Sequence, residues 1–367
     1  MKYVINKEER PVYLQLYRQL REDIIKGVFP YNTKLPSKRL LADETGVSTI
    51  TIEHAYALLC EEGYAEARER SGYFVIFRSA DGFAVSASDG EQQRCIEHTE
   101  QNYPCFSVSL LSKTMRRVLT DYNAVILEKS PNEGCVELRS ALKQYLARNR
   151  GIYVELDQII IGSGAEYLYG LIVDLLGRGR IYAIESPSYE KIEQIYRAAG
   201  VTYEALPLSA DGIDGKALLE SRADVLHTTP YRSFPSGVTA SASKRHEYIR
   251  WSDQGERFIV ESDYGSEFSV ASKPAETLFA LAKKDNVIYL NTFSKTISPS
   301  LRVAYMVLPK KLVRPFEEKL GFYSCTVPTF EQFVLTELIN NGDFERHINR
   351  VRRNKRKELM SAAEKKL

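Results

Sequence analysis

The alternation of short apolar runs with helical segments constrains the fold of this chain more than any other feature. From residue 158 onward, runs of strand length recur between segments of helical period: "QIIIG", "IYAIE", "VTYEALP", "DVLHTTP", "RFIVES", "NVIYLN" and "RVAYMVLP". Strands separated by helices of this length need right-handed crossovers, which give a mainly parallel sheet covered on both faces. The pattern predicts an α/β domain, and no internal repeat accompanies it.

The first 77 residues follow a different pattern. Helical periodicity runs through "PVYLQLYRQLREDIIK", "LPSKRLLADETG" and "VSTITIEHAYALLCEEGY", and the last two segments begin near the N-cap candidates Ser37 and Ser48. Two short extended pieces then flank Ser71 and Gly72, which is a hairpin signal. Three helices closed by a small hairpin predict a winged helix-turn-helix, whose third helix enters the major groove of DNA.

Four segments are expected along the 367 residues. Residues 1–77 form the DNA-binding domain, and residues 78–105, rich in Ser, Asp, Gly and Gln, form a linker. Residues 106–340 form the α/β domain, and residues 341–367 form a basic amphipathic helix with a solvated face. The net charge of the whole chain is only +2, so DNA binding has to depend on a local patch.

The cysteines bear on redox state and on metal binding. They are odd in number and never spaced as Cys-x-x-Cys: Cys60, Cys95, Cys105, Cys135 and Cys325. This pattern argues against a disulfide framework and against a zinc site, so no metal is expected. The N-terminus lacks a continuous apolar core, and no segment has eighteen uninterrupted apolar residues. We therefore expect a cytoplasmic protein with no membrane partner.

The first candidate site follows the run "QIII". In an open α/β sheet, ligands bind beyond the carboxyl ends of the strands. Here the chain continues as "GSGAEYLYGL", in which small residues enter a helix. Free backbone N–H groups at such a helix start can cradle an anion, although Gly164 and Ala165 also fit a plain helix start. Tyr167 stands where a dinucleotide-binding motif has its third glycine, so the cradle suits one phosphate better.

Reactive and aromatic side chains follow three other runs. Tyr189 comes after "IYAIE", Asp263 and Tyr264 come after "RFIVE", and Thr292 and Lys295 come after "NVIYLN". A lysine there can form a Schiff base, a carboxylate can hold a pyridine nitrogen protonated, and an aromatic ring can stack on a heteroaromatic plane. Each residue alone is more often a surface or packing residue. Together they favour pyridoxal 5'-phosphate, the cofactor that uses all of these groups at once.

The N-terminal segment resembles the GntR family of transcriptional regulators. The resemblance rests on "LPSKRLLADETGVST", "TIEHAYALLCEEGY" and "SGYFV". It implies double-stranded DNA as a partner. The residues that it implies as DNA contacts are Lys38, Arg39, Ser48, Thr49 and Thr51, with Gly72 at the wing tip. Taken alone, Lys38 and Arg39 also fit a solvated helix face, whereas the complete pattern favours phosphate contacts. Many relatives carry arginine where Thr49 stands, so one DNA contact is expected to be lost or moved.

The rest of the chain resembles the large domain of class I aminotransferases, which have fold type I. The motifs "SPNEGCVELRSALKQYLARNRGI", "IIIGSGAEYL", "IESPSY", "TTPYRSFPSGVT", "ESDYGSEF" and "TFSKTISPSLRVAYMVLP" stand in the family's order, and with the N-terminal segment they resemble the MocR subfamily. The resemblance implies pyridoxal 5'-phosphate as cofactor and Lys295 as the lysine that forms the aldimine. It assigns the phosphate to Thr292, Arg302 and the backbone of Gly164, Ala165 and Glu166, ring stacking to Tyr189, and the phenolic oxygen to Tyr264.

Three departures from the family pattern bear on this site. Relatives usually carry two acids before the tyrosine, and here these positions are Ser262 and Asp263; side chains alternate at a strand end, so one of them points at the ring, and we expect Asp263. Phe234 replaces an asparagine that bonds the phenolic oxygen, while Arg232 adds charge at the mouth. Residues 341–367 would begin a truncated small domain, so closure over an amino-acid substrate is expected to be impaired.

Three functions are compatible with this combination. The first is a homodimeric, pyridoxal-phosphate-dependent transcriptional regulator that senses the cofactor, or an amine or amino-acid effector, through Lys295. The second is an active aminotransferase with an accessory DNA-binding head. The third is a DNA-binding regulator with a degenerate, cofactor-free body. Head, linker and cofactor site in one chain favour the first, with weak transaminase activity at most.

Overall fold

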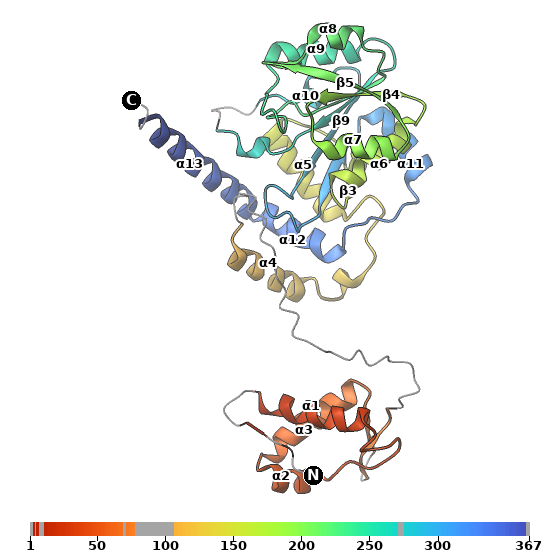
Figure 1. The fold of residues 1–367 in the computed structure, drawn as a ribbon, viewed down its shortest axis with the longest axis vertical. Coiled ribbons are helices and arrows are strands. Elements are labelled where there is room, and N and C mark those ends of the chain that lie inside the picture. Colours follow the sequence, from red (N-terminus) through yellow and green to blue (C-terminus); the bar gives the residue numbers. More distant parts are fainter. Residues whose placement is uncertain are drawn as a thin grey trace. The chain divides into compact units, whose positions relative to one another are not determined.

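The chain divides into two structural units, residues 1–98 and residues 99–367. The computed structural model describes residues 3, 5–6, 11–68, 71–77, 106–270 and 275–364. The linker predicted over residues 78–105 lies outside the described residues. Figure 1 shows the helices and strands of both units.

In its described residues, the smaller unit combines three helices with a two-stranded antiparallel sheet. Its elements are α1 (Val12–Ile25), α2 (Lys38–Thr45), α3 (Thr49–Glu61), β1 (Ala65–Arg68) and β2 (Gly72–Val75). The hydroxyls of Ser37 and Ser48 accept hydrogen bonds from the N–H groups of Leu40 and Thr51, so they cap α2 and α3. Gly46 ends α2 in the left-handed conformation, at φ 67°. These elements confirm the predicted winged helix-turn-helix.

The larger unit is built on an eight-stranded sheet in the order β3-β10-β9-β8-β7-β4-β5-β6. Its strands are β3 (Ile159–Gly162), β4 (Ile181–Ser186), β5 (Thr202–Ser209), β6 (Gly212–Ile213), β7 (Val225–Thr228), β8 (Phe258–Ser262), β9 (Val287–Thr292) and β10 (Ala304–Val307). The strands from β9 through β8, β7 and β4 to β5 pair in parallel, while β10 is antiparallel to both of its neighbours and β6 is antiparallel to β5. The predicted α/β fold with a mainly parallel sheet is confirmed.

Helices cover both faces of this sheet (Figure 1). One face, called here the α6 face, packs against α6 (Ala165–Leu176), α7 (Glu190–Ala198) and α11 (Lys310–Leu320). The opposite α5 face packs against α5 (Val136–Arg150), α8 (Gly215–Glu220), α9 (Ala242–Ser252), α10 (Leu278–Leu281) and α12 (Thr329–Asn340). Neighbouring residues in a strand point to opposite faces. Thus Leu290 of β9 is buried with α6, and Tyr289 is buried with α5.

Two further helices flank the sheet domain. These are α4 (Val108–Asp121), which is followed by a short 3₁₀ turn, and α13 (Asp343–Glu364). The start of α13 packs into the core through Phe344, Ile348 and Val351. Further along, Arg352 donates a hydrogen bond to the backbone oxygen of Glu267, which ties α13 to the loop after β8. Figure 1 shows α13 leading away from the sheet toward the C-terminus.

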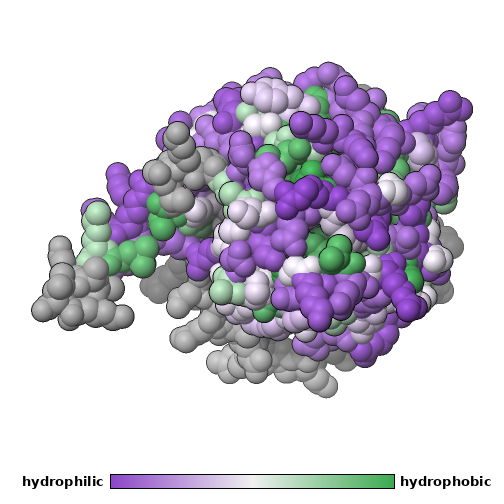
Figure 2. Space-filling model, turned by 90° about the horizontal axis from the view of Figure 1, so that it is seen from above, coloured by the Kyte–Doolittle hydropathy of each residue, from purple (hydrophilic) through white to green (hydrophobic). Residues whose placement is uncertain are grey.

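Hydrophilic side chains predominate on the face of the molecule that Figure 2 shows, and hydrophobic ones form small separate groups. Most large apolar side chains of the described residues are instead buried in the core clusters. Within the described ranges, no helix is long and apolar enough to cross a membrane.

Candidate functional site

The turn from β3 into α6 has a backbone conformation that requires glycine. Gly164 has φ 93° and ψ 161°, a combination that only glycine adopts without strain. A Cβ at this position would lie 2.8 Å from Nη2 of Arg302. The guanidinium therefore approaches the start of α6 closely, where backbone N–H groups and the helix dipole already favour negative charge. This arrangement suits a bound phosphate.

A carboxylate of the chain itself occupies part of this cradle. Glu166 pairs with Arg302 through one oxygen, and its other oxygen lies 2.7 Å from Nζ of Lys191. Partial burial alone would raise the pKa of Glu166, but Lys191 and Arg302 together lower it. An incoming anion would compete with this carboxylate for the two cations.

Lys295 lies just beyond the end of β9. Thr292 fixes the preceding turn, because its hydroxyl accepts a hydrogen bond from the N–H of Ser294. The lysine side chain is partly buried, and Nζ lies 4.3 Å from the centroid of the Tyr264 ring. Burial lowers the pKa of Lys295, and the positive charges of Arg232 and Lys355 lower it further. A larger fraction of the amine is therefore neutral, which is the form that attacks a carbonyl carbon.

A second glycine, which was not among the predicted site residues, lies against the lysine side chain. Gly265 has φ 86°, and a Cβ there would lie 2.7 Å from both Cδ and Nζ of Lys295. Any side chain at this position would displace the amine. The stretch "SDYGSEF" contains the glycine but does not indicate the approach of Lys295, which depends on the tertiary structure.

Tyr189 stands at the start of α7 and keeps 39% of its surface exposed. Its ring meets the ring of Phe234 edge-on, with the centroids 6.3 Å apart. Phe234 is the residue that replaces the asparagine of the aminotransferase pattern, and it is itself exposed. The partial exposure leaves the Tyr189 ring available for stacking.

The two residues before Tyr264 point in different directions. The Asp263 side chain is fully buried, 2.7 Å from Nη2 of Arg150, and it accepts a hydrogen bond from the Tyr289 hydroxyl, also at 2.7 Å. The Ser262 hydroxyl lies 2.9 Å from the hydroxyl of Tyr169 on α6. Burial alone would lower the pKa of Arg150, but the Asp263 charge outweighs it and raises that pKa. Arg150, which ends α5, was not anticipated, because nothing local in the sequence couples it to residue 263.

The residues predicted to face DNA gather at α2 and at the start of α3. Arg39 is exposed, whereas Nζ of Lys38 lies 2.9 Å from a carboxylate oxygen of Glu53. The N-cap Ser48 and the following Thr49 are exposed as well. Ile50, which was not predicted, keeps 64% of its surface exposed, and an apolar side chain at this place fits contact with a thymine methyl group.

The wing position Gly72 has φ 108°, and a Cβ there would lie 3.1 Å from Cε of Lys34. The turn between β1 and β2 falls partly on residues 69–70, which are outside the described residues. Thr51, in the first turn of α3, donates its backbone N–H to Ser48, and its hydroxyl lies 2.8 Å from the Ser48 hydroxyl.

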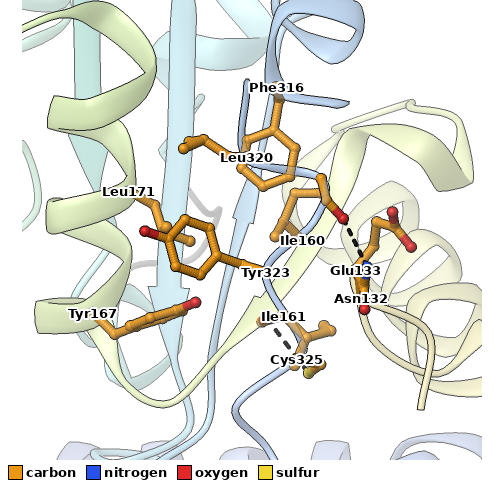
Figure 3. Close-up of a pocket in the computed structure, with 11 residues that line it drawn as sticks. Asn132, Glu133, Ile160, Ile161, Tyr167, Leu171, Phe316, Leu320, Tyr323 and Cys325 are labelled. Carbon is orange, nitrogen blue, oxygen red and sulfur yellow. Dashed lines mark hydrogen bonds between the residues drawn. The ribbon is translucent and has the colours of Figure 1, made fainter. Parts of the chain in front are cut away.

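A small pocket lies apart from the strand-end residues. Figure 3 shows its lining from β3, α6, α11 and the loops beside them: Asn132, Glu133, Ile160, Ile161, Tyr167, Leu171, Phe316, Leu320, Gly321, Tyr323 and Cys325. Asn132 closes one side by donating a hydrogen bond of 2.7 Å to the backbone oxygen of Gly321 (Figure 3). None of the predicted site residues lines this pocket.

Metal binding has no support in the described part of the chain, where no cluster of three His, Cys, Asp or Glu side chains could hold an ion. The cysteines of the described ranges, Cys60, Cys135 and Cys325, are free. Burial raises the pKa of the Cys135 thiol to about 11.

Fold and site together define a protein with a DNA-binding head and an aminotransferase-like body, and comparisons with known proteins agree. Residues 12–75 match the family of bacterial regulatory proteins of the gntR type, and residues 110–364 match the class I and II aminotransferases. The chain is 31% identical to the HTH-type transcriptional regulator YdeL of Bacillus subtilis (strain 168), over 97% of this chain and 80% of YdeL. It is 27% identical to the probable rhizopine catabolism regulatory protein MocR of Rhizobium meliloti, over 94% of this chain and 74% of MocR.

Solved aminotransferase structures have a body similar to that of this chain. The kynurenine aminotransferase of Pyrococcus horikoshii, a complex with PMP, aligns with a TM-score of 0.63 at 27% identity, over 68% of this chain and 65% of that one. LysN, the α-aminoadipate aminotransferase of Thermus thermophilus, aligns with a TM-score of 0.59 at 26% identity, over 68% of this chain and 66% of that one. The chain belongs to the GntR-type transcriptional regulators that carry a class I and II aminotransferase domain, the MocR subfamily.

Proposed function

We propose that this protein is a pyridoxal-phosphate-dependent transcriptional regulator that holds its cofactor at Lys295. The observation that carries the proposal is the placement of Lys295: it is partly buried and lies over Tyr264, in a chain that also has a winged helix-turn-helix. The related regulator PdxR of Corynebacterium glutamicum, 26% identical over 94% of this chain and 77% of PdxR, is a pyridoxine biosynthesis regulator by name. That name agrees with a vitamin B6 compound as the ligand.

The residues present fit a pyridine aldehyde that carries one phosphate. The absence of a Cβ at Gly164 lets the Arg302 guanidinium approach the start of α6, and its absence at Gly265 leaves room for the lysine amine. When bound, the cofactor supplies an aldehyde carbon that condenses with an amine. The proposed contacts are the phosphate with Thr292, Arg302 and the N–H groups at Gly164, Ala165 and Glu166, the ring with Tyr189, and the phenolic oxygen with Tyr264.

The charges near Lys295 suit an effector that carries a carboxylate. Burial is the largest cause that lowers the pKa of Lys295, and the charges of Arg232 and Lys355 lower it further. Burial also lowers the pKa of Lys355, and the charge of Arg232 adds to that effect. Neither Arg232 nor Lys355 forms a salt bridge with the described residues, although the Lys355 amine lies 5.0 Å from the centroid of the Phe268 ring. An amino acid could place its amine at the cofactor and its carboxylate between these two cations.

Regulation then requires that the ligand favour one arrangement of the body over another. A ligand shifts such an equilibrium only by its difference in affinity for the two states. We propose a cytoplasmic homodimer in which this difference changes how two winged helices meet DNA. The DNA contacts are assigned to Lys38, Arg39, Ser48, Thr49 and Thr51, with Gly72 at the wing.

The test is a titration of the purified full chain with pyridoxal 5'-phosphate, followed by absorbance, and a measurement of DNA affinity with and without the cofactor. Lys295→Ala should remove the Schiff-base band and the effect on DNA affinity. The matched control is Lys311→Ala, because Lys311 also lies over an aromatic ring, 4.6 Å from the centroid of Phe258, but on α11. A band that survives in Lys295→Ala would refute the proposal, and sustained turnover of amino-acid and 2-oxo-acid pairs would favour an active aminotransferase instead.

A further inference from the structure

The groups proposed to hold the cofactor lie on the α6 face of the sheet. The phosphate cradle is the start of α6 itself, and Tyr189 precedes α7, which packs on the same face through Ile192. Thr292 belongs to this face as well, since it follows Leu290 by two residues in β9. A cofactor held by its phosphate at α6 and by its ring at Tyr189 therefore approaches the strand ends from this side.

Ser262 is the last residue of β8 on that same face. It pairs in register with Leu290, which is buried with α6, and adjacent residues of paired strands point to the same side. Its hydroxyl lies 2.9 Å from that of Tyr169, a residue of α6. Tyr169 is near the cradle, because it lies on α6 three residues after Glu166 and therefore one turn further along the same side of the helix.

Asp263 points to the opposite face and is already engaged there. Its carboxylate pairs with Arg150 of α5 and accepts a hydrogen bond from Tyr289, which is buried on the α5 face. Turning Asp263 toward a ligand on the α6 face would leave the Arg150 charge buried and unpaired, which is costly in a protein interior. Its second oxygen, Oδ1, has no hydrogen-bond partner among the described residues. This oxygen is therefore the competing candidate for a hydrogen bond to the cofactor ring.

We propose that the hydroxyl of Ser262, and not the carboxylate of Asp263, meets the pyridine nitrogen of the bound cofactor. The assignment rests on the proposed function, since it requires a pyridine ring at this site. It makes Ser262 a hydrogen-bond donor to an unprotonated nitrogen, while Tyr169 donates its own hydroxyl proton to the Ser262 oxygen.

The hydrogen-bond partner of Ser262 and the histidine that packs on that partner are uncharged, which agrees with an unprotonated ring. Burial raises the pKa of Tyr169 to about 12, and burial lowers the pKa of His227 to about 3, so both are neutral near pH 7. The His227 ring contacts the Tyr169 ring edge-on, with centroids 4.7 Å apart, and its Nδ1 lies 2.7 Å from the Tyr196 hydroxyl. These neutral groups do not supply the negative charge that would hold a pyridinium.

The consequence concerns what the site does with an amine. When bound, the cofactor would assist removal of a proton from the α-carbon of an attached amine strongly if its ring were protonated and weakly if the ring were neutral. A site with a serine here can bind an amine covalently and still release it unchanged. That behaviour suits a sensor better than a transaminase.

The experiment is nitrogen-15 NMR of the full chain loaded with pyridoxal 5'-phosphate labelled at the ring nitrogen. The wild-type protein should show the chemical shift of an unprotonated pyridine, and Ser262→Asp should move the shift to that of a pyridinium. Ser262→Ala should weaken cofactor binding by roughly 3- to 10-fold, the range for one neutral hydrogen bond, and leave the nitrogen unprotonated.

The control is Asp263→Asn, which should leave the nitrogen shift unchanged. A pyridinium shift in the wild type that becomes neutral in Asp263→Asn would overturn the serine assignment and leave the proposed function standing. If Asp263→Asn does not fold, the wild-type shift alone still decides. Absence of any bound cofactor signal would overturn both the assignment and the proposed function.

Discussion

Replacing Gly164 with alanine should destabilise the larger unit and damage the phosphate cradle together. The φ and ψ of Gly164, 93° and 161°, lie in a region that costs other residues about 1–3 kcal/mol. The new methyl group would also lie 2.8 Å from Nη2 of Arg302. Arg302 is half exposed and can move aside, so the backbone term should dominate the loss of folding free energy, while the movement should weaken phosphate binding.

The chain offers a matched control on the same helix. Gly170 lies inside α6, and a Cβ there would meet nothing within 4 Å. Gly170→Ala should therefore stabilise the unit by about 0.5–1 kcal/mol, since glycine is unfavourable within a helix. The two alanine variants should differ in free energy of unfolding by about 1.5–4 kcal/mol, with Gly164→Ala the less stable variant.

Urea unfolding measures this difference in the right part of the molecule. The single tryptophan of the chain, Trp251, is buried in α9, so its fluorescence reports on the larger unit. Cofactor titration of the same samples measures the cradle, and Gly170→Ala should bind like the wild type. An unfolding midpoint of Gly164→Ala equal to or above that of Gly170→Ala would refute the reasoning from backbone strain.

Three further predictions follow from charges. Burial, with Asp263 nearby, raises the pKa of Glu267 to about 7, so the stability that Glu267 contributes is complete below its usual pKa near 4.5 and is lost as the pH rises through 7. Glu267→Gln should remove this loss of stability with rising pH. Urea midpoints that change equally between pH 5 and pH 8 in the wild type and in Glu267→Gln would contradict the prediction. Glu166→Gln should tighten binding of inorganic phosphate a few-fold by freeing Arg302, as measured by calorimetric titration, and unchanged affinity would show that the carboxylate does not compete. Arg39→Ala should weaken binding about equally across DNA sequences and lower the salt slope by about one, and a sequence-selective loss would instead identify a base contact.

The order of the elements was readable from the chain alone because local periodicity carries it. All seven apolar runs became strands, and the N-cap serines Ser37 and Ser48 begin the helices that they were predicted to begin. The two-residue strand β6 was not predicted, since two residues carry no period. The antiparallel direction of β10 was not predicted either, because strand direction depends on which neighbours a strand finds, and sequence period does not record that.

The residues of the candidate site also divide into those that the sequence predicts and those that only the tertiary structure reveals. Lys295, Thr292 and Tyr189 follow apolar runs, so a rule about strand ends was sufficient to select them as candidates. Gly265 matters only because the lysine side chain returns across it, at a distance that no spacing rule gives.

The pair at the end of β8 shows most clearly where sequence reasoning stops. The sequence by itself determined that Ser262 and Asp263 stand at a strand end and point to opposite faces, because the backbone of a strand alternates. It also determined the polar and charged groups available, and hence the class of cofactor that they suit. Only the tertiary structure decided which face each side chain meets, since the partner of Asp263, Arg150, lies 113 residues away in sequence, and the partner of Ser262, Tyr169, lies 93 residues away. Packing of α5 and α6 against the two faces brings these partners together, and burial makes the Asp263–Arg150 pair costly to break.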